Sequence, residues 1–144
     1  MITLLDVSVL IALGDAGHVH EAAALQFFEH EAVPGGWSTC PITENAFLRI
    51  LSHPSYPRSL GTPMESRRVL SRLLACPGHH FWPDDLSLSD GRLYPELPAS
   101  KHLTDYFLLG LAVKHGGRFA TFDSGIDATL VPGGPATLHL IPTR

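Results

Sequence analysis

Short apolar runs and longer segments with helical spacing alternate along the chain. The apolar runs have the length of buried β-strands, and they lie at 2–5, 37–40, 79–82, 118–122 and 138–141. The longer segments place apolar residues three and four positions apart, as amphipathic helices do, and they lie at 20–31, 41–52, 63–75 and 104–115. Strands that alternate with helices predict an α/β fold built on a parallel sheet.

We predict one domain over residues 1–144. The chain has 144 residues, of which 44% are hydrophobic and 17% are charged, so it can bury a core of its own. Glycine and proline mark the connections between elements, above all in the turn Pro132-Gly133-Gly134-Pro135. No linker is long enough to divide the chain.

Charge and cysteine content narrow the classes of function. The formal net charge of -4 excludes the broadly basic surface of a non-specific duplex-binding protein, so any contact with nucleic acid has to be local. Cys40 and Cys76 form no CxxC pair, which indicates a reduced intracellular protein rather than a disulfide scaffold or a zinc ribbon. Since the chain has neither an apolar run of about 18 residues nor a basic leader, we expect no membrane span and a cytoplasmic location.

Four acidic residues fall where predicted strands end or helices begin. Asp6 and Asp123 each follow a strand directly. Glu44 and Asp105 each begin an apolar stripe with spacing i, i+3, i+4, i+7, so both face inward at the start of a helix. Because ligands of parallel α/β sheets bind outside the carboxyl ends of the strands, these four acids are the first candidates for chemistry.

Each acid taken alone has a structural explanation. An acid in the first turn of a helix is favoured by the helix dipole by about 0.3–1 kcal/mol, and Thr104 resembles an N-cap before Asp105. Acids that follow strands commonly form turns. Four carboxylates at one sheet edge, however, repel one another and are costly to desolvate, so the combination predicts a bound cation. Ligation by oxygen alone favours Mg²⁺, with Mn²⁺ as the alternative, over zinc.

Four segments together carry a resemblance to a known family. They are Leu4-Leu5-Asp6-Val7-Ser8 with the apolar run that follows it, Thr39 to Leu51 around Glu44, Leu103 to Ala112 around Asp105, and Ala120-Thr121-Phe122-Asp123. In this order, and over nearly the whole chain, they resemble the PIN domain in its VapC toxin branch. The resemblance implies a single PIN-like domain with a parallel central sheet flanked by helices. It also implies a metal-dependent endoribonuclease that is the toxin of a toxin–antitoxin pair, with RNA as substrate, a cognate antitoxin as partner and a homodimer as the assembly.

The resemblance makes Asp6, Glu44, Asp105 and Asp123 the catalytic acids. We expect Asp6 and Asp105 to hold the metal directly, and Glu44 and Asp123 to hold it directly or through water and to help deprotonate the nucleophile. Ser8 corresponds to a small polar residue of the family and is expected to orient Asp6. Ser124 departs from the basic residue often found at its position.

Other polar residues allow two interpretations each. Arg68 and Arg72 share one face of the predicted helix at 63–75, where a solvated surface near Glu65 is the default and an RNA or antitoxin contact is the alternative. Tyr56 is a candidate for stacking on an unpaired base. The nine histidines form no HExxH motif, and we expect most of them on the surface or in loops.

Two other functions are alternatives to a nuclease. A receiver or aspartyl-phosphatase domain also gathers acids at strand ends, but the chain has no late-strand lysine and has Ser8 where a second aspartate is needed. A catalytically silent PIN-like binding module is the other alternative, and the presence of all four acids argues against it.

Overall fold

A five-stranded parallel sheet forms the centre of the structure, which is a computed structural model that describes residues 1–143. The strand order is β3-β2-β1-β4-β5, and every neighbouring pair is parallel. The strands are β1 (Thr3–Leu5), β2 (Trp37–Thr39), β3 (His79–Phe81), β4 (Arg118–Thr121) and β5 (Leu138–Leu140). All five were predicted, and the predicted fold class is confirmed.

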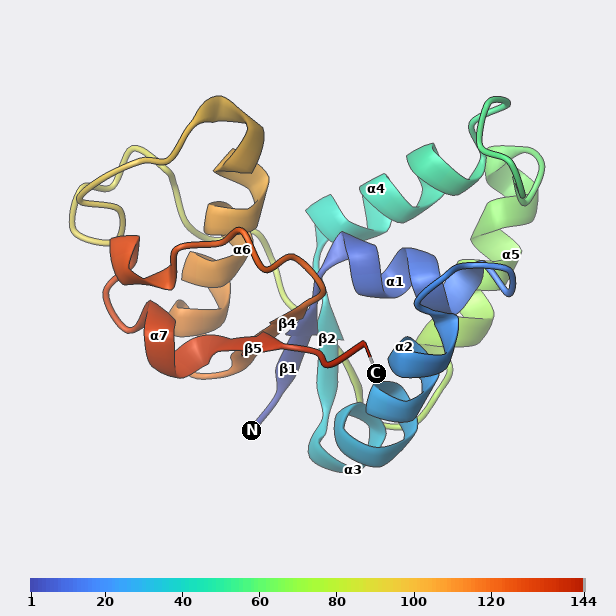
Figure 1. The fold of residues 1–144 in the computed structure, drawn as a ribbon, viewed down its shortest axis with the longest axis horizontal. Helices are drawn as coiled ribbons and strands as arrows, with labels where there is room; N and C mark the ends of the chain where they lie inside the picture. Colours follow the sequence, from blue (N-terminus) through green and yellow to red (C-terminus); the bar gives the residue numbers. More distant parts are fainter. Residues whose placement is uncertain (144) are drawn as a thin grey trace.

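Helices cover both faces of this sheet (Figure 1). They are α1 (Val7–Gly14), α2 (Glu21–Phe27), α3 (Val33–Gly35), α4 (Pro41–Leu51), α5 (Pro63–Leu74), α6 (Leu103–Lys114) and α7 (Gly134–Thr137). Three short helical segments of other types lie at Phe28–Ala32, Ser100–His102 and Ala128–Leu130. None of the helices within residues 1–143 is long and apolar enough to cross a membrane.

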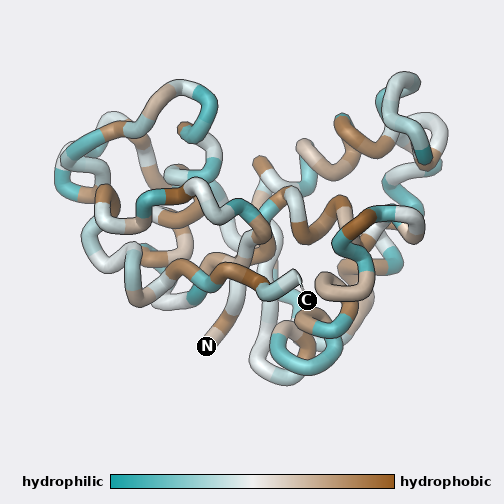
Figure 2. The backbone as a smooth tube through the Cα atoms, viewed as in Figure 1, coloured by the Kyte–Doolittle hydropathy of each residue, from teal (hydrophilic) through white to brown (hydrophobic). Residues whose placement is uncertain are grey.

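Alternating side chains of the central strands divide the core into two layers. Leu5 and Ala120 belong to one cluster, which packs under α1, α2, α4 and α5. Leu4 and Phe119 belong to the other, which packs under α6. The two layers follow from the geometry of a strand, in which successive side chains point to opposite faces. Figure 2 shows hydrophobic stretches along α1 and α4, both of which contribute residues to the first of these clusters.

Residues 7–14 form helix α1, an element that the hydrophobic pattern does not predict. Val9, Leu10, Ile11 and Ala12 are all buried, because the helix packs against the sheet, α2 and α4. A helix that is apolar all round has no polar face, and therefore gives no periodic signal. Asp6 begins this helix as its N-cap.

Two further boundaries differ from the prediction. The helix expected at 20–31 continues past α2 through a wide π-type turn and α3, and it stops at Gly36, whose φ of 92° lets the chain turn into β2. The Pro132–Pro135 turn contains the start of α7, with Pro135 in its first turn.

The strand order places a topological switch point between β1 and β4. The chain runs outward from β1 to β2 and β3, and later returns to lay β4 on the other side of β1. In open parallel sheets, ligands bind at such a point, outside the carboxyl ends of the two strands. Asp6 and Asp123 are the acids that follow those two strands.

Candidate active site

Asp6 is a buried carboxylate held by neutral donors. Its side chain is at the carboxyl end of β1, and the residue is 4% exposed. Oδ1 accepts a hydrogen bond from the backbone N–H of Val7 (2.7 Å), and Oδ2 accepts from the hydroxyls of Ser8 (3.1 Å) and Thr121 (2.6 Å). Burial nevertheless raises the pKa of Asp6, and the charge of Asp123 raises it further. The contact from Ser8 is the one that its expected orienting role requires.

Asp105 lies in the first turn of α6, but the predicted cap of this helix is wrong. The helix begins at Leu103, so Thr104 lies inside it, and His102 occupies the N-cap position without a capping hydrogen bond from its side chain. The preceding residues 100–102 form a turn of 3₁₀-helix that extends the helical path toward the amino end. An earlier helix start explains why the local signal at Thr104 misled the prediction.

His102, Asp105 and Asp123 form a cluster at this sheet edge. One donor atom from each lies within 4.8 Å of the other two, and His102 Nδ1 is 3.8 Å from Asp105 Oδ2. Burial, followed by the charges of Asp6 and Asp123, raises the pKa of Asp105 to about 6. The charges of Asp6 and Asp123 thus raise the proton affinity of Asp105, and a divalent cation bound among these acids would take the place of its proton. The residues therefore fit the metal that the sequence predicts.

The sequence analysis did not single out His102. The residue falls three positions before Asp105, which is a helical spacing, but the predicted helix began after it. Because position 102 was not predicted to be helical, its spacing from Asp105 did not indicate that the imidazole lies near the acids.

Glu44 lies in the first turn of α4, as predicted, but it is not part of the three-residue cluster. Its Oε2 accepts a hydrogen bond from the buried hydroxyl of Thr39 (2.6 Å), which ends β2. Thr39 Oγ1 is also 2.8 Å from His79 Nε2. Because the single hydroxyl proton goes to the carboxylate, the imidazole has to donate to Thr39. The sequence analysis missed this chain of contacts, since it joins three separate elements.

Arg68 and Arg72, the two predicted cationic residues, form no ion pair with the four candidate acids within residues 1–143. Arg68 and Arg72 are both exposed on α5, and no ion pair joins Arg68 to Glu65 within residues 1–143. The Tyr56 hydroxyl donates to the buried Asp15 carboxylate and the residue packs against the core, so less of its ring is open for stacking than we expected.

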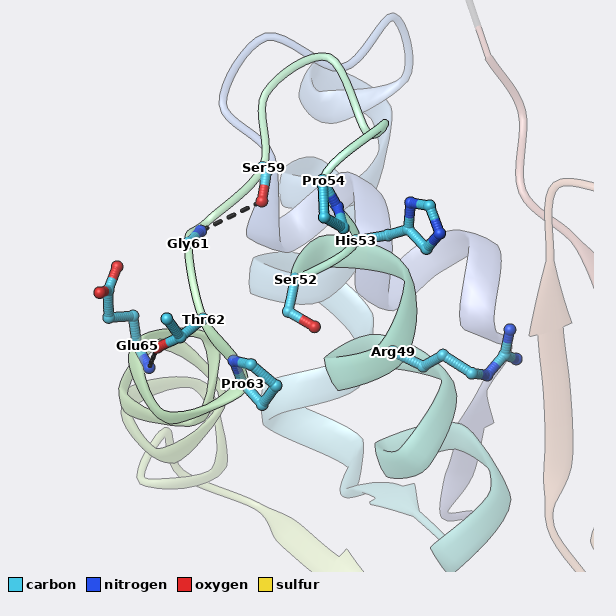
Figure 3. A pocket seen from close by; sticks show the side chains of 9 residues that line it. All are labelled: Arg49, Ser52, His53, Pro54, Ser59, Gly61, Thr62, Pro63 and Glu65. Carbon is cyan, nitrogen blue, oxygen red and sulfur yellow. Dashed lines mark hydrogen bonds between the residues drawn. The ribbon is translucent and has the colours of Figure 1, made fainter.

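A different arginine lies closer to the site. Arg49, on α4, is exposed and lines a hollow of about 350 Å³ together with Asn45, Asp84 and Thr104. Thr104 directly precedes Asp105, so this hollow borders the acidic edge. Arg49 also lines a larger hollow of about 750 Å³ between the end of α4 and the start of α5 (Figure 3). Within residues 1–143 it forms no ion pair, so its charge is available to a phosphate.

Asp127 and the cysteines have structural roles. Asp127 caps the segment at 128–130 by accepting a hydrogen bond from the backbone N–H of Thr129 (3.1 Å). Both cysteines are free, and burial raises the pKa of the Cys40 thiol to about 11. A thiol that stays protonated is not a nucleophile.

Comparison with known proteins places this geometry in context. The family model described as "PIN domain" matches residues 3–129. Ribonuclease VapC39 of Mycobacterium tuberculosis is 42% identical over 128 residues, which are 88% of this chain and 91% of the relative. Ribonuclease VapC44 of the same organism is 39% identical over 135 residues, which are 92% and 94% of the two chains.

Solved structures with the same fold were also found. VapBC2 from Rickettsia felis, bound to a DNA fragment from its promoter, superposes with a TM-score of 0.68 at 11% identity and covers 99% of this chain and 100% of that one. Mycobacterium tuberculosis VapC20, a toxin that cleaves the sarcin-ricin loop, gives a TM-score of 0.62 at 12% identity, with 97% and 99% covered.

Proposed function

The chain belongs to the PIN-domain family, and from this premise we propose that it is a metal-dependent endoribonuclease and the toxin of a type II toxin–antitoxin pair. The observation that carries the proposal is the meeting of Asp6, Asp105 and Asp123 at the switch point of the sheet, with repulsion that a cation would relieve. The relatives named as ribonucleases match over most of their length, which favours the same reaction here. Its place of action is the cytoplasm, where RNA is available.

Mg²⁺ is the proposed ion, and Asp6 and Asp105 are the residues that would hold it. When bound, such an ion supplies Lewis acidity toward a phosphodiester and water. Ser8 and Thr121 hold the Asp6 carboxylate in one orientation through hydrogen bonds of 3.1 and 2.6 Å. Asp123 lies in one cluster with Asp105 and His102 and can accept a proton from the attacking water.

Glu44 is proposed to assist from the neighbouring strand end. One of its oxygens is occupied by Thr39, so the other is left to accept a proton or to bind water. The reaction is then hydrolysis, in which water attacks phosphorus, the P–O bond to the leaving ribose oxygen breaks, and the carboxylates accept the proton that water releases.

The cognate antitoxin is the proposed partner. A partly buried acidic crevice is a natural receptor for an arginine or lysine side chain, which would neutralise the same carboxylates as the metal. Arg68 and Arg72 remain candidates for the antitoxin surface, since they are exposed on α5. A homodimer of the toxin is part of the same proposal.

The direct test is cleavage of total RNA by the purified chain with Mg²⁺ and with EDTA, followed by sequencing of the new ends. Asp6→Asn and Asp105→Asn should abolish cleavage and keep the fold. Asp127→Asn removes a nearby loop charge but keeps a capping side chain, so it is the matched control and should cleave normally. Full activity of both site variants would refute the assignment.

The partner is tested by co-expression with the product of the gene immediately upstream. We expect that product to co-purify with the chain and to inhibit cleavage. If it does neither while cleavage itself is intact, the antitoxin proposal fails and the nuclease proposal stands.

A further inference from the structure

We propose that His102 is an imidazole ligand of this acidic site and makes the site favour Mn²⁺ over Mg²⁺. The inference rests on the proposed metal site and adds a ligand that the carboxylate pattern does not contain. It follows from the position of one ring nitrogen among the carboxylate oxygens.

The side chain of His102 turns toward Asp105, three residues later, and does not cap its own helix. The residue stands at the N-cap of α6, yet its side chain makes no capping hydrogen bond. The side chain is 27% exposed, so the ring is largely covered by protein rather than free in solvent. Its Nδ1 faces Asp105 Oδ2 at 3.8 Å, which is too long for a hydrogen bond.

That separation suits two ligands of one ion. Donors about 2.1 Å from a common cation lie about 3.0 Å apart when adjacent and about 4.2 Å apart when opposite. The 3.8 Å between His102 and Asp105 falls inside this span, and the whole group with Asp123 stays within 4.8 Å. The 4.8 Å limit exceeds the roughly 4.2 Å of opposite ligands, so a small side-chain rotation has to bring the three donors onto one ion.

The chemistry of the added donor determines the preference. Mg²⁺ is a hard ion that prefers oxygen ligands and keeps its waters, whereas later divalent ions accept imidazole nitrogen more readily. A site built only from Asp6, Asp105 and Asp123 would distinguish Mg²⁺ from Mn²⁺ weakly. With His102 the same site gains a nitrogen ligand that benefits Mn²⁺.

The test compares Mn²⁺ and Mg²⁺ binding to the parent chain and to His102→Gln by calorimetry. Loss of a ligand should weaken Mn²⁺ binding by about tenfold or more, the scale seen even when a partner behind a ligand is removed, and should change Mg²⁺ binding by much less. His30→Gln is the matched control, because His30 is exposed and lies beside Glu31, which pairs with Arg118 at the opposite end of β4. It should bind both ions as the parent does.

Pulsed electron paramagnetic resonance of bound Mn²⁺ supplies a readout that a structural role would not change. The parent should show coupling to a ¹⁴N nucleus, and His102→Gln should lose it. His102→Asp offers an oxygen ligand instead, so it should bind Mg²⁺ more tightly than His102→Gln and still lack the ¹⁴N coupling. This variant also places a good capping residue at the N-cap, which protects the fold.

Each other outcome overturns a separate claim. Unchanged ¹⁴N coupling in His102→Gln, or equal losses of Mn²⁺ and Mg²⁺ affinity, overturns the role of His102 and leaves the carboxylate site in place. A parent chain that binds neither ion overturns the metal site and the proposed nuclease together.

Discussion

Asp105→Asn should stabilise the metal-free protein at pH 8. The pKa of Asp105 is about 6 in the fold against an ordinary value of 3.8. Each pKa unit corresponds to 1.36 kcal/mol, so keeping this carboxylate ionised in the folded state costs about 3 kcal/mol of stability above pH 7. The cause is burial first and then the charges of Asp6 and Asp123, and asparagine removes both effects.

The sign of the pH dependence follows from the raised pKa. Between about pH 4 and pH 6 the folded state holds this proton more tightly than the unfolded chain, so stability from Asp105 falls as the pH rises. Below about pH 4 both states are protonated, and the parent and the Asn variant should differ little. The stability of Asp105→Asn relative to the parent should therefore grow from near zero at pH 4 to about 2–3 kcal/mol at pH 8.

Urea denaturation in EDTA, followed by circular dichroism at pH 4, 6 and 8, measures this difference. Glu96→Gln is the matched control, because Glu96 is exposed and forms no hydrogen bond or ion pair within residues 1–143. It removes the same charge and should show no pH-dependent gain. A constant difference between Asp105→Asn and the parent across this range, or a less stable variant at pH 8, would refute the electrostatic reasoning.

Added Mg²⁺ should reduce this difference between the variant and the parent. At an ion concentration of 100 times Kd, binding stabilises the parent by about 2.7 kcal/mol, and Asp105→Asn gains less because a ligand is missing. Equal stabilisation of both proteins by Mg²⁺ would show that Asp105 is not a ligand.

Three further predictions concern neighbouring residues. In the inactive Asp105→Asn background, Arg49→Gln should weaken RNA binding. It should also lower the slope of log affinity against log salt concentration by about 0.7, the value of one phosphate contact on a single strand. Arg68→Ala with Arg72→Ala should leave this slope unchanged, and fluorescence anisotropy at several salt concentrations measures both. Thr39→Val should slow single-turnover cleavage by about tenfold at saturating RNA, and Thr39→Ser should restore it, because only the serine hydroxyl can hold Glu44. Asp15→Asn should lower the free energy of unfolding by about 2 kcal/mol at pH 7, because the Arg58 guanidinium holds the pKa of Asp15 well below its usual range. This contribution is present above the pKa of the unfolded aspartate and disappears as the pH falls through the folded value. The stabilities of the variant and the parent should therefore converge in an acid titration.

Strand ends were the most predictable part of the site. The apolar runs before Asp6 and Asp123 are short and bounded, and parallel strands carry such residues to one edge of the sheet. Glu44 and Asp105 could be predicted equally well, because each begins a helical stripe whose apolar positions recur at fixed spacing.

The parts that sequence could not supply depend on contacts between distant elements. The link from Glu44 through Thr39 to His79 crosses β2, β3 and α4, and no local pattern encodes it. Tyr56 looked free because its loop is rich in proline, yet it is turned inward by Asp15, which is distant in sequence. His102 was missed because the predicted helix starts at 104, whereas α6 starts at Leu103 and the 3₁₀ turn before it starts at Ser100.

A comparison of Asp15 with Asp6 separates a structural carboxylate from a functional one. Both are buried, at 2% and 4% exposure. Asp15 accepts two hydrogen bonds from the Arg58 guanidinium, of 2.7 and 2.9 Å, and its pKa falls. Asp6 accepts only from neutral groups, and its pKa rises because these donors do not offset burial.

The same contrast extends to the whole acidic edge. Within residues 1–143 no lysine or arginine forms an ion pair with Asp6, Asp105 or Asp123, although Arg58 and Arg118 pair with acids elsewhere. The fold thus orients Asp6 and Asp123 with hydroxyl and amide donors, and within residues 1–143 only His102 lies at ion-pair distance from these acids, so the edge keeps an excess of negative charge. An uncompensated buried charge is unfavourable in the free protein, and it is what gives an incoming cation, whether a metal ion or an antitoxin side chain, its affinity.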